Sequence, residues 1–186
     1  VILNELNSDS AEVRFTSKDG VVLTVVREGE RLMMDFPSVP GIPSDDIDPV
    51  AEALGARPEA YLVARDGMAV FPDQAAVEGL QPDMVRIAAL DPMGIIATSP
   101  GKDFDFVSRF FAPKVGIPED PVTGSAHCTL IPYWSKRLGK STLLARQISE
   151  RGGVINCEYR GDRVIMGGTA VPFLEGVITL PTEGEY

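Results

Sequence analysis

One ten-residue segment, 119–128, collects the groups that could bind and protonate a small anion. It reads EDPVTGSAHC, so two carboxylates stand shortly before a Gly-Ser pair at which a helix is predicted to begin. Thr123 is a favourable N-cap residue, and Gly124 would let a ligand come close to the backbone. The first amides of a helix have no acceptor within it and lie at the positive end of its dipole. The amides of Gly124, Ser125 and Ala126 are therefore expected to form an anion site.

Two side chains add further chemistry to this anion site. The Ser125 hydroxyl is a hydrogen-bond donor, and Asp120 could accept or position a proton. The segment therefore indicates a site for the carboxylate group of a small-molecule substrate, with Asp120 in a catalytic role. The same residue types also fit an Asp-Pro turn before a capped helix that binds nothing, and the local pattern leaves both interpretations open.

Three other side chains could reach such a site. His127 could contact substrate, but a positive charge is unfavourable in the first turn of a helix, which favours a packing or hydrogen-bonding role. Arg109 and Arg151 could bind a substrate carboxylate. Each could instead form a structural ion pair with Glu119 or Asp120, and this second role is favoured.

The composition argues against other classes of site. The chain has 27 acidic and 17 basic residues in 186, a net charge of −10, which makes it a poor partner for nucleic acid. One His and two Cys, Cys128 and Cys157, have no metal-type spacing, so no structural zinc site is expected. Two sparse thiols suit the cytoplasm. No apolar run reaches the roughly 18 residues of a membrane helix.

The element that must position the site is a helix over 124–138. Its apolar residues repeat at i, i+4 spacing and predict one buried stripe, formed by Ala126, Leu130, Trp134 and Leu138. Gly139 is expected to end the helix. Pro132 has no N–H to donate to the carbonyl of Cys128, which predicts a kink.

The rest of the chain is predicted to be rich in β-strands. Expected strands cover 12–16, 21–27, 31–36, 60–64, 68–71, 94–98, 104–111, 142–148, 154–159, 163–166 and 170–180. The segment 37–44 is expected to be a linker. A helix capped by Asp48 is expected to end at Gly55, and two short helices are expected near 73–79 and 82–90.

An internal repeat connects two of the β-rich regions. Residues 17–34 read SKDGVVLTVVREGERLMM, and residues 149–166 read SERGGVINCEYRGDRVIM, at an offset of 132 residues without a gap. Any two β-hairpins share turn glycines, so this pattern has a second explanation. If the repeat is real, the chain holds two similar domains, and the helix of the first would lie before Val1.

Several motifs follow one another along the chain. They are MDFP at 34–37, FFAP at 110–113, GI at 116–117, EDPVTGSAH at 119–127, YWS at 133–135, LGK at 138–140, QISERGG at 147–153 and GGTAV at 167–171. Together they resemble the phenazine-biosynthesis PhzF-like isomerase family over nearly the whole chain.

The resemblance implies an α+β, diaminopimelate-epimerase-like fold. In such a fold two similar domains each wrap an antiparallel, barrel-like sheet around a central helix, and the active site lies between them. The family resembles cofactor-free isomerases in which a carboxylic acid removes and returns a proton. Asp120, Gly124 and Ser125 match the substrate site of the second domain. Family analogy also suggests a homodimer.

Two features depart from the family pattern. No SETAF-like or CGHAT-like string occurs, so the catalytic glutamate is expected in a missing N-terminal segment, and Glu119 does not replace it. Residues 1–38 are then a remnant of the first domain, which a strand near 176–186 could join, and 44–175 form the second. Related thiol epimerases place Cys where this chain has Thr123, which disfavours a thiol mechanism.

The sequence therefore predicts a cofactor-independent, PhzF-like isomerase that shuttles a proton on a small carboxylate-bearing substrate. This chain alone is expected to be inactive, because half of the cleft would be absent. The alternative is a non-catalytic binding or scaffold protein on the same fold.

Overall fold

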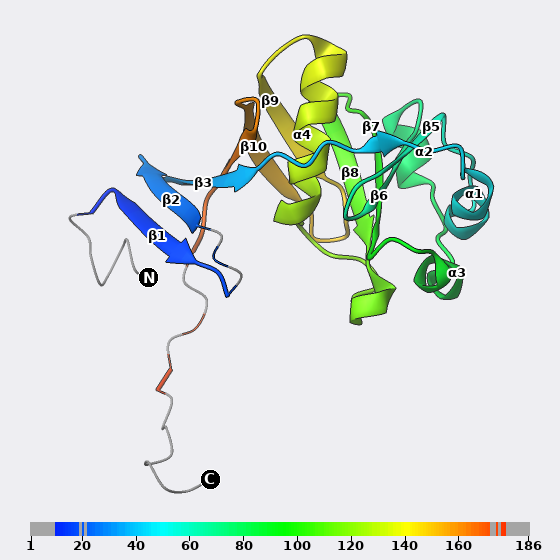
Figure 1. Ribbon diagram of the computed structural model, residues 1–186, viewed down its shortest axis with the longest axis horizontal. Helices are drawn as coiled ribbons and strands as arrows, with labels where there is room; N and C mark the ends of the chain where they lie inside the picture. The colour runs from blue at the N-terminus through cyan, green and yellow to red at the C-terminus, as the bar shows by residue number, and fades with distance from the viewer. Residues whose placement is uncertain (1–9, 19, 21, 172–173, 175, 178–186) are drawn as a thin grey trace, which may run out of the picture.

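The computed structural model describes residues 10–18, 20, 22–171, 174 and 176–177 (Figure 1). The helices within this range are α1 (Asp48–Leu54), α2 (Gln74–Glu78), α3 (Met84–Ala89), α4 (Gly124–Leu138) and the 3-10 helix η2 (Pro113–Val115). The strands are β1 (Glu12–Thr16), β2 (Val22–Glu28), β3 (Arg31–Pro37), β4 (Ile42–Pro43), β5 (Ala60–Val63), β6 (Gly67–Val70), β7 (Ile95–Pro100), β8 (Phe106–Phe111), β9 (Thr142–Gln147), β10 (Gly153–Tyr159) and β11 (Arg163–Gly168).

All these strands belong to one sheet, in the order β1-β2-β3-β11-β10-β9-β8-β7-β6-β5-β4. Only two neighbouring pairs of the described strands are parallel, β6 with β7 and β8 with β9. The sheet is therefore mixed, whereas antiparallel sheets were expected. Its order within the described residues has two ends, β1 and β4.

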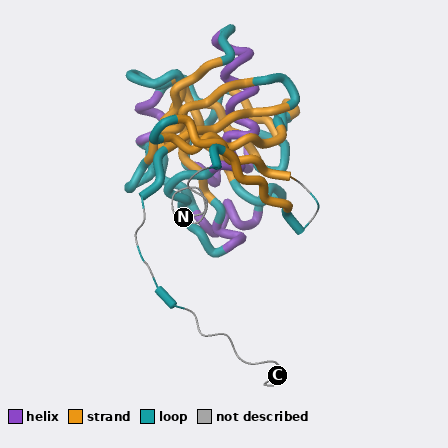
Figure 2. The backbone as a smooth tube through the Cα atoms, turned by 90° about the vertical axis from the view of Figure 1, so that its left-hand side faces the viewer, coloured by secondary structure: helices purple, strands orange, loops and turns teal. Residues whose placement is uncertain are grey.

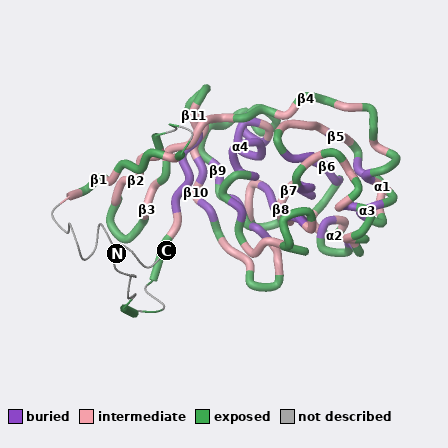
Figure 3. Tube along the Cα trace, turned by 60° about the horizontal axis from the view of Figure 1, so that its bottom comes forward, coloured by how far each residue is buried: buried purple, intermediate pink, exposed green. Residues whose placement is uncertain are grey.

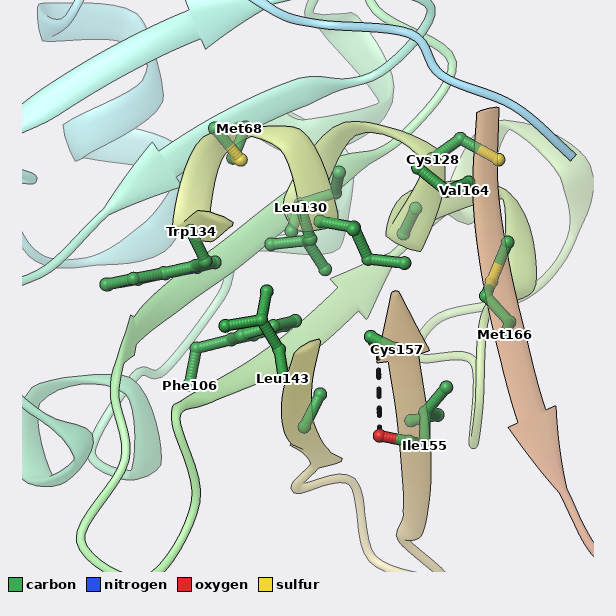
Figure 4. Close-up of a cluster of buried hydrophobic side chains, with 14 of the residues drawn as sticks. Met68, Phe106, Cys128, Leu130, Trp134, Leu143, Ile155, Cys157, Val164 and Met166 are labelled. Carbon is green, nitrogen blue, oxygen red and sulfur yellow. Dashed lines mark hydrogen bonds between the residues drawn. The ribbon is translucent and has the colours of Figure 1, made fainter. Parts of the chain in front are cut away.

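Helices pack on both faces of this sheet (Figure 2). Successive residues of a strand point to opposite faces, and β6 shows this clearly. Met68 packs in the cluster around α4 with Leu130 and Trp134 (Figure 4). The next residue, Ala69, packs in a second cluster that contains the buried side chains of α1, α2 and α3. The long helix α4 thus occupies one face, and the three short helices cover the other.

The core is centred on the strands nearest α4. Strand β6 is buried throughout, and β7 and β8 have one half-buried residue each. No described residue of β1, β2 or β3 is fully buried (Figure 3). The first three strands therefore extend the sheet beyond its core, and the core itself supports the segment before α4.

Helix α4 has the predicted boundaries, and a neighbouring segment satisfies the carbonyl that its proline leaves free. The helix runs without a break from Gly124 to Leu138 and ends at Gly139, whose φ of 67° is left-handed. The Val39 N–H donates to the Cys128 carbonyl oxygen at 2.9 Å, in the place of the missing Pro132 donor. The predicted linker 37–44 thus crosses α4, and it also contributes β4.

The repeated segments form two hairpins with the same register. Thr24 pairs with Asp35 in the first hairpin, and Asn156 pairs with Gly167 in the second, each 132 residues further along. Their turn glycines also agree, with φ of 62° at Gly29 and 78° at Gly161. The two hairpins belong to one sheet, because β3 of the first pairs with β11 of the second. The division into a 1–38 remnant and a 44–175 domain stays a prediction.

Several local predictions were wrong. Asp48 is the first residue of α1 and not its cap, because Ile47 occupies the N-cap position. Strand β6 runs from Gly67 to Val70, one residue earlier at each end than the expected 68–71. Leu138, the last residue of α4, is 42 % exposed, since the helix end extends past the core. The strand expected over 170–180 falls largely outside the described residues, and the described ones there are not in a strand.

Candidate functional site

The first turn of α4 presents open backbone amides at the surface. Thr123 occupies the N-cap position with extended φ and ψ of −115° and 102°, but its side chain makes no capping bond. Gly124 and Ser125 are exposed, and no atom lies within 4 Å of a Cβ built on Gly124. Ala126 is buried, so it offers its amide and not its side chain. The amides of Gly124 and Ser125 are therefore accessible from the solvent, and the anion site expected there stays a prediction.

The Thr123 side chain does not cap the helix as expected, because it bonds to Asp120 instead. Its Oγ1 donates to Oδ2 of Asp120 at 2.6 Å. A carboxylate is a stronger acceptor for a hydroxyl than a neutral group. The structure thus brings Asp120 to the start of α4 and leaves the amides of Gly124 and Ser125 without a partner among the described residues.

Gln147, at the end of β9, contacts the candidate site, and the sequence did not predict this role for its side chain. Its side chain is completely buried and bonds to two residues of the loop before α4. Nε2 donates to the Asp120 carbonyl oxygen at 2.7 Å and to Thr123 Oγ1 at 3.1 Å. Oε1 accepts from the Thr123 amide at 2.8 Å. Gln147 begins the QISERGG motif, but no function was assigned to that motif from the sequence.

Arg109 forms a structural ion pair. Its Nε and Nη2 donate to the two carboxylate oxygens of Glu119 at 2.8 and 2.9 Å. Its Nη1 also lies 3.3 Å from the carbonyl oxygens of Val77 and Leu80. These bonds occupy the guanidinium group, so the favoured structural role of Arg109 agrees with its geometry. Both carboxylate oxygens of Glu119 are engaged in the same pair.

His127 is buried beneath the site instead of facing a ligand. Its exposed fraction is 0 %, and Nδ1 lies 2.7 Å from the Thr123 carbonyl oxygen. A carbonyl can only accept, so Nδ1 carries the proton of this bond. Burial lowers the pKa of His127 from 6.5 to about 4. The imidazole is therefore neutral at pH 7 and supports Thr123 from the interior.

A surface depression of about 430 Å³ lies beside the start of α4. Its lining residues come from the loop before α4 and from the β9–β10 turn, and they are Glu119, Pro121, Ser149, Glu150 and Arg151. Ser149 Oγ donates to the Pro121 carbonyl oxygen at 2.7 Å and connects these two segments. Arg151, the second candidate arginine, has no ion pair among the described residues, so it does not form the structural pair that was favoured for it.

The cysteines lie in the core and do not suit nucleophilic chemistry. Cys128 is 8 % exposed and Cys157 is 2 % exposed. Burial raises the pKa of the Cys128 thiol from 9.0 to about 11 and that of Cys157 to about 12. The thiolate is the reactive form, so neither residue is activated. The described residues also contain no cluster of His, Cys, Asp or Glu suited to a metal ion.

The phenazine biosynthesis-like protein (PhzC-PhzF) family model matches residues 4–176. The chain belongs to this family. Two uncharacterized isomerases of Pseudomonas aeruginosa are 41 % and 43 % identical to it, over 97 % and 96 % of this chain and 69 % of each relative. A phenazine biosynthesis-like domain-containing protein of Rattus norvegicus is 33 % identical over 96 % of this chain and 69 % of its own length.

Solved structures of the family share the fold. A PhzF-family phenazine biosynthesis protein from Enterococcus faecalis has a TM-score of 0.91 at 41 % identity, covering 97 % of this chain and 69 % of that protein. A structure described as a predicted epimerase from Pseudomonas aeruginosa has a TM-score of 0.64 at 17 % identity, covering 90 % of this chain and 67 % of that one, which shows a likeness of fold alone. Nothing in these matches supports the expectation that a catalytic glutamate lies in a missing segment.

The family is thus the one that the motifs predicted, and the fold is PhzF-like. The two barrel-like pseudo-repeat domains expected of that fold stay a prediction. Isomerase is the kind of activity that several relatives are named for. No helix in the described part of the chain is long and apolar enough to span a membrane. The site residues themselves are tested by none of these matches, so their roles are proposals.

Proposed function

We propose that the start of α4 is the substrate site of an isomerase that moves a proton on a small carboxylate-bearing molecule. The observation that carries this proposal is the exposed first turn of α4 beside a carboxylate. The amides of Gly124 and Ser125 are open, and Asp120 is bonded to the residue immediately before them. A helix N-terminus favours a bound carboxylate, and the Ser125 hydroxyl adds a donor.

The chemistry assigned to the site is proton transfer without a cofactor. A carboxylate group removes a proton from the substrate and, as the carboxylic acid so formed, returns it at another position. The proton count of substrate and protein is therefore unchanged at the end of the reaction. Asp120 positions the substrate or assists the transfer. The amides at the start of α4 hold the substrate carboxylate, which places the reacting carbon near Asp120. A homodimer and a cytoplasmic location stay predictions.

Binding can be tested on the 186-residue chain by NMR. Titration of the ¹⁵N-labelled chain with acetate and with benzoate should shift the amide signals of Gly124, Ser125 and Ala126 in a saturable manner. Ser125→Ala should weaken binding by roughly tenfold, because a hydrogen bond to a charged group contributes about 1.5 kcal/mol or more. Ser141→Ala, an exposed serine beyond the other end of α4, is the matched control and should leave binding unchanged. Shifts that do not saturate, or that are indifferent to Ser125→Ala, would remove the proposed site.

Solvent deuterium incorporation tests the proton step. We expect the chain to exchange no carbon-bound proton of small carboxylic acids in D₂O, because the SETAF-like and CGHAT-like motifs of the family do not occur in its sequence. Incorporation detected by mass spectrometry would contradict this inactivity. If Asp120→Asn abolished that incorporation, the role of Asp120 would be supported. Carboxylate binding without any proton exchange in the 41 %-identical relative from Pseudomonas aeruginosa would favour the alternative of a binding protein.

A further inference from the structure

Thr123 is held at every one of its polar atoms by buried side chains. Its amide donates to Gln147 Oε1, and its carbonyl accepts from His127 Nδ1. Its hydroxyl oxygen lies 3.1 Å from Gln147 Nε2 and 2.6 Å from Asp120 Oδ2. Gln147 and His127 are both 0 % exposed. Thr123 is 6 % exposed, so its polar groups need hydrogen-bond partners, and its hydroxyl connects Gln147 to Asp120.

The direction of these hydrogen bonds follows from the chemistry of the donors. A backbone N–H can only donate, so the Gln147 atom that faces the Thr123 amide must be the oxygen. The amide nitrogen of Gln147 then points the other way, and its two hydrogens go to the Asp120 carbonyl and to Thr123 Oγ1. Because Oγ1 already accepts from Gln147, the single Thr123 hydroxyl proton is directed at Asp120 Oδ2.

This direction distinguishes the two oxygens of the Asp120 carboxyl group. Oδ2 accepts the Thr123 proton at 2.6 Å, and this bond makes Oδ2 the less basic of the two oxygens. Oδ1 has no hydrogen bond among the described residues, and Asp120 is half-buried next to the open amides of α4. Oδ1 is thus the oxygen left to face a ligand.

We propose that Gln147 is a positioning residue for Asp120, which acts through the Thr123 hydroxyl to leave Oδ1 as the oxygen that exchanges a proton. The inference rests on the proposed function, in which Asp120 assists a proton transfer. When Oδ1 takes a proton from the substrate, the carboxylate becomes a neutral acid, and when it gives the proton back, the carboxylate is restored. Throughout both steps Oδ2 keeps its bond to Thr123, so the geometry of Asp120 does not change.

Gln147→Glu reverses the direction of the chain of hydrogen bonds with almost no change of shape. One oxygen of the carboxylate that this substitution introduces can still accept from the Thr123 amide. The other oxygen, when the new group is ionised, can only accept, so it draws the Thr123 hydroxyl proton away from Asp120. A residue that merely held the loop would not change the partner of this proton. The variant thus separates positioning of Asp120 from support of the backbone.

The measurement is the NMR isotope shift that the Thr123 hydroxyl transmits to its acceptor. The ¹³C-labelled chain is dissolved in an equal mixture of H₂O and D₂O, and the side-chain carboxyl carbons are recorded. In the unchanged chain the Asp120 carboxyl signal should be displaced or split by the hydroxyl isotope. In Gln147→Glu this effect should leave Asp120 and appear on the carboxyl carbon of residue 147. Thr123→Ser should retain the effect at Asp120, and Thr123→Val should lose it.

Two outcomes would overturn the proposal: no isotope effect at Asp120 in the unchanged chain, or an effect that stays at Asp120 in Gln147→Glu. If the buried charge of Gln147→Glu prevents folding, Gln147→Met removes the donor that orients Thr123 Oγ1 without burying a charge. The isotope effect at Asp120 should then become smaller, and an effect of unchanged size would also overturn the proposal. The experiment needs no substrate. A negative isotope-shift result would contradict the role of Gln147 but would not affect the proposal that α4 binds a carboxylate. A negative carboxylate titration would contradict the proposed function but would not affect the direction of the hydrogen bonds.

Discussion

At the residue scale, His127 supports the site from the core. Its surroundings determine this role, and its position in the motif did not predict it. It stands in the first turn of the helix, yet its ring points into the core, with its centroid 6.0 Å from that of Phe106. Nδ1 bonds to Thr123, and Nε2 is buried without a partner among the described residues. Protonation would place a charge in this apolar contact, near the positive end of the helix dipole. The neutral ring is therefore part of what holds the site together.

Lowering the pH should destabilise the chain through His127. The pKa of His127 is about 4 in the folded chain and 6.5 when unfolded, so the unfolded state binds the proton first as the pH falls. Stability should thus be unaffected above pH 6.5 and decline from there toward pH 4, by about 2 kcal/mol between pH 7 and pH 5. Urea unfolding at the two pH values measures this loss. His127→Asn cannot titrate and should lose much less, and an equal loss in both proteins would contradict the assignment.

The site residues differ in how far the sequence could predict them. Gly124 and Ser125 follow from a local rule, since a Gly-Ser pair at the start of a helix exposes amides whatever the rest of the fold does. Gln147 obeys no such rule, because it meets Thr123 across 24 residues of sequence and only through the packing of β9. For the same reason the Thr123 hydroxyl was expected to cap the helix, although the folded chain offers it a carboxylate.

At the scale of the elements, one hydrogen bond connects α4 to the segment 37–44 that crosses it. A proline inside a helix removes one hydrogen bond and leaves a carbonyl free. In this chain the free carbonyl belongs to Cys128, which is 8 % exposed, and it is satisfied by the Val39 N–H. Pro132 therefore removes one hydrogen bond within the helix and leaves a carbonyl to which residues 37–44 bond.

Replacing the donor at position 39 should destabilise the chain unless the helix regains its own donor. Val39→Pro should cost about 1–3 kcal/mol, because the buried Cys128 carbonyl loses its partner. Pro132→Ala supplies an N–H to the same carbonyl, so the loss caused by Val39→Pro should be smaller by about 1 kcal/mol in that background. Chemical denaturation of the four proteins of this cycle measures the coupling, and strictly additive losses would show that the carbonyl is not shared.

At the scale of the whole molecule, the sequence predicts most of the helices and strands but fewer of the pairings between strands. Strands such as β1 and helix α4 have the expected limits, because turn glycines and the apolar period are local signals. The parallel pairs β6–β7 and β8–β9 were not foreseen, since they join strands through intervening loops and helices. The β3–β11 pair unites segments about 130 residues apart, and no local signal specifies such a contact.

The two parts of the sheet differ in how they are stabilised. Strands β6 to β8 lie between α4 on one face and the short helices on the other. Strands β1 to β3 have exposed or half-buried residues throughout, and they join the rest through β11, where Arg163 Nε donates to Asp35 Oδ1 at 2.8 Å. A segment with few buried apolar contacts opens at a lower free energy than the core.

Hydrogen exchange of the 186-residue chain should therefore follow a gradient along the sheet order. Backbone amides of β1 and β2 should exchange fastest, those of β3 that bond to β11 at an intermediate rate, and those of β7 and β8 slowest. Protection factors in β1 and β2 should be at least about a hundredfold below those of β7, which corresponds to about 3 kcal/mol of opening free energy. Asp35→Asn, which weakens the ion pair to Arg163, should lower protection in β3 and leave β7 unchanged. Equal protection in β1 and β7 would show instead that the eleven strands open as one cooperative unit, with the β3–β11 pair as firm as the core.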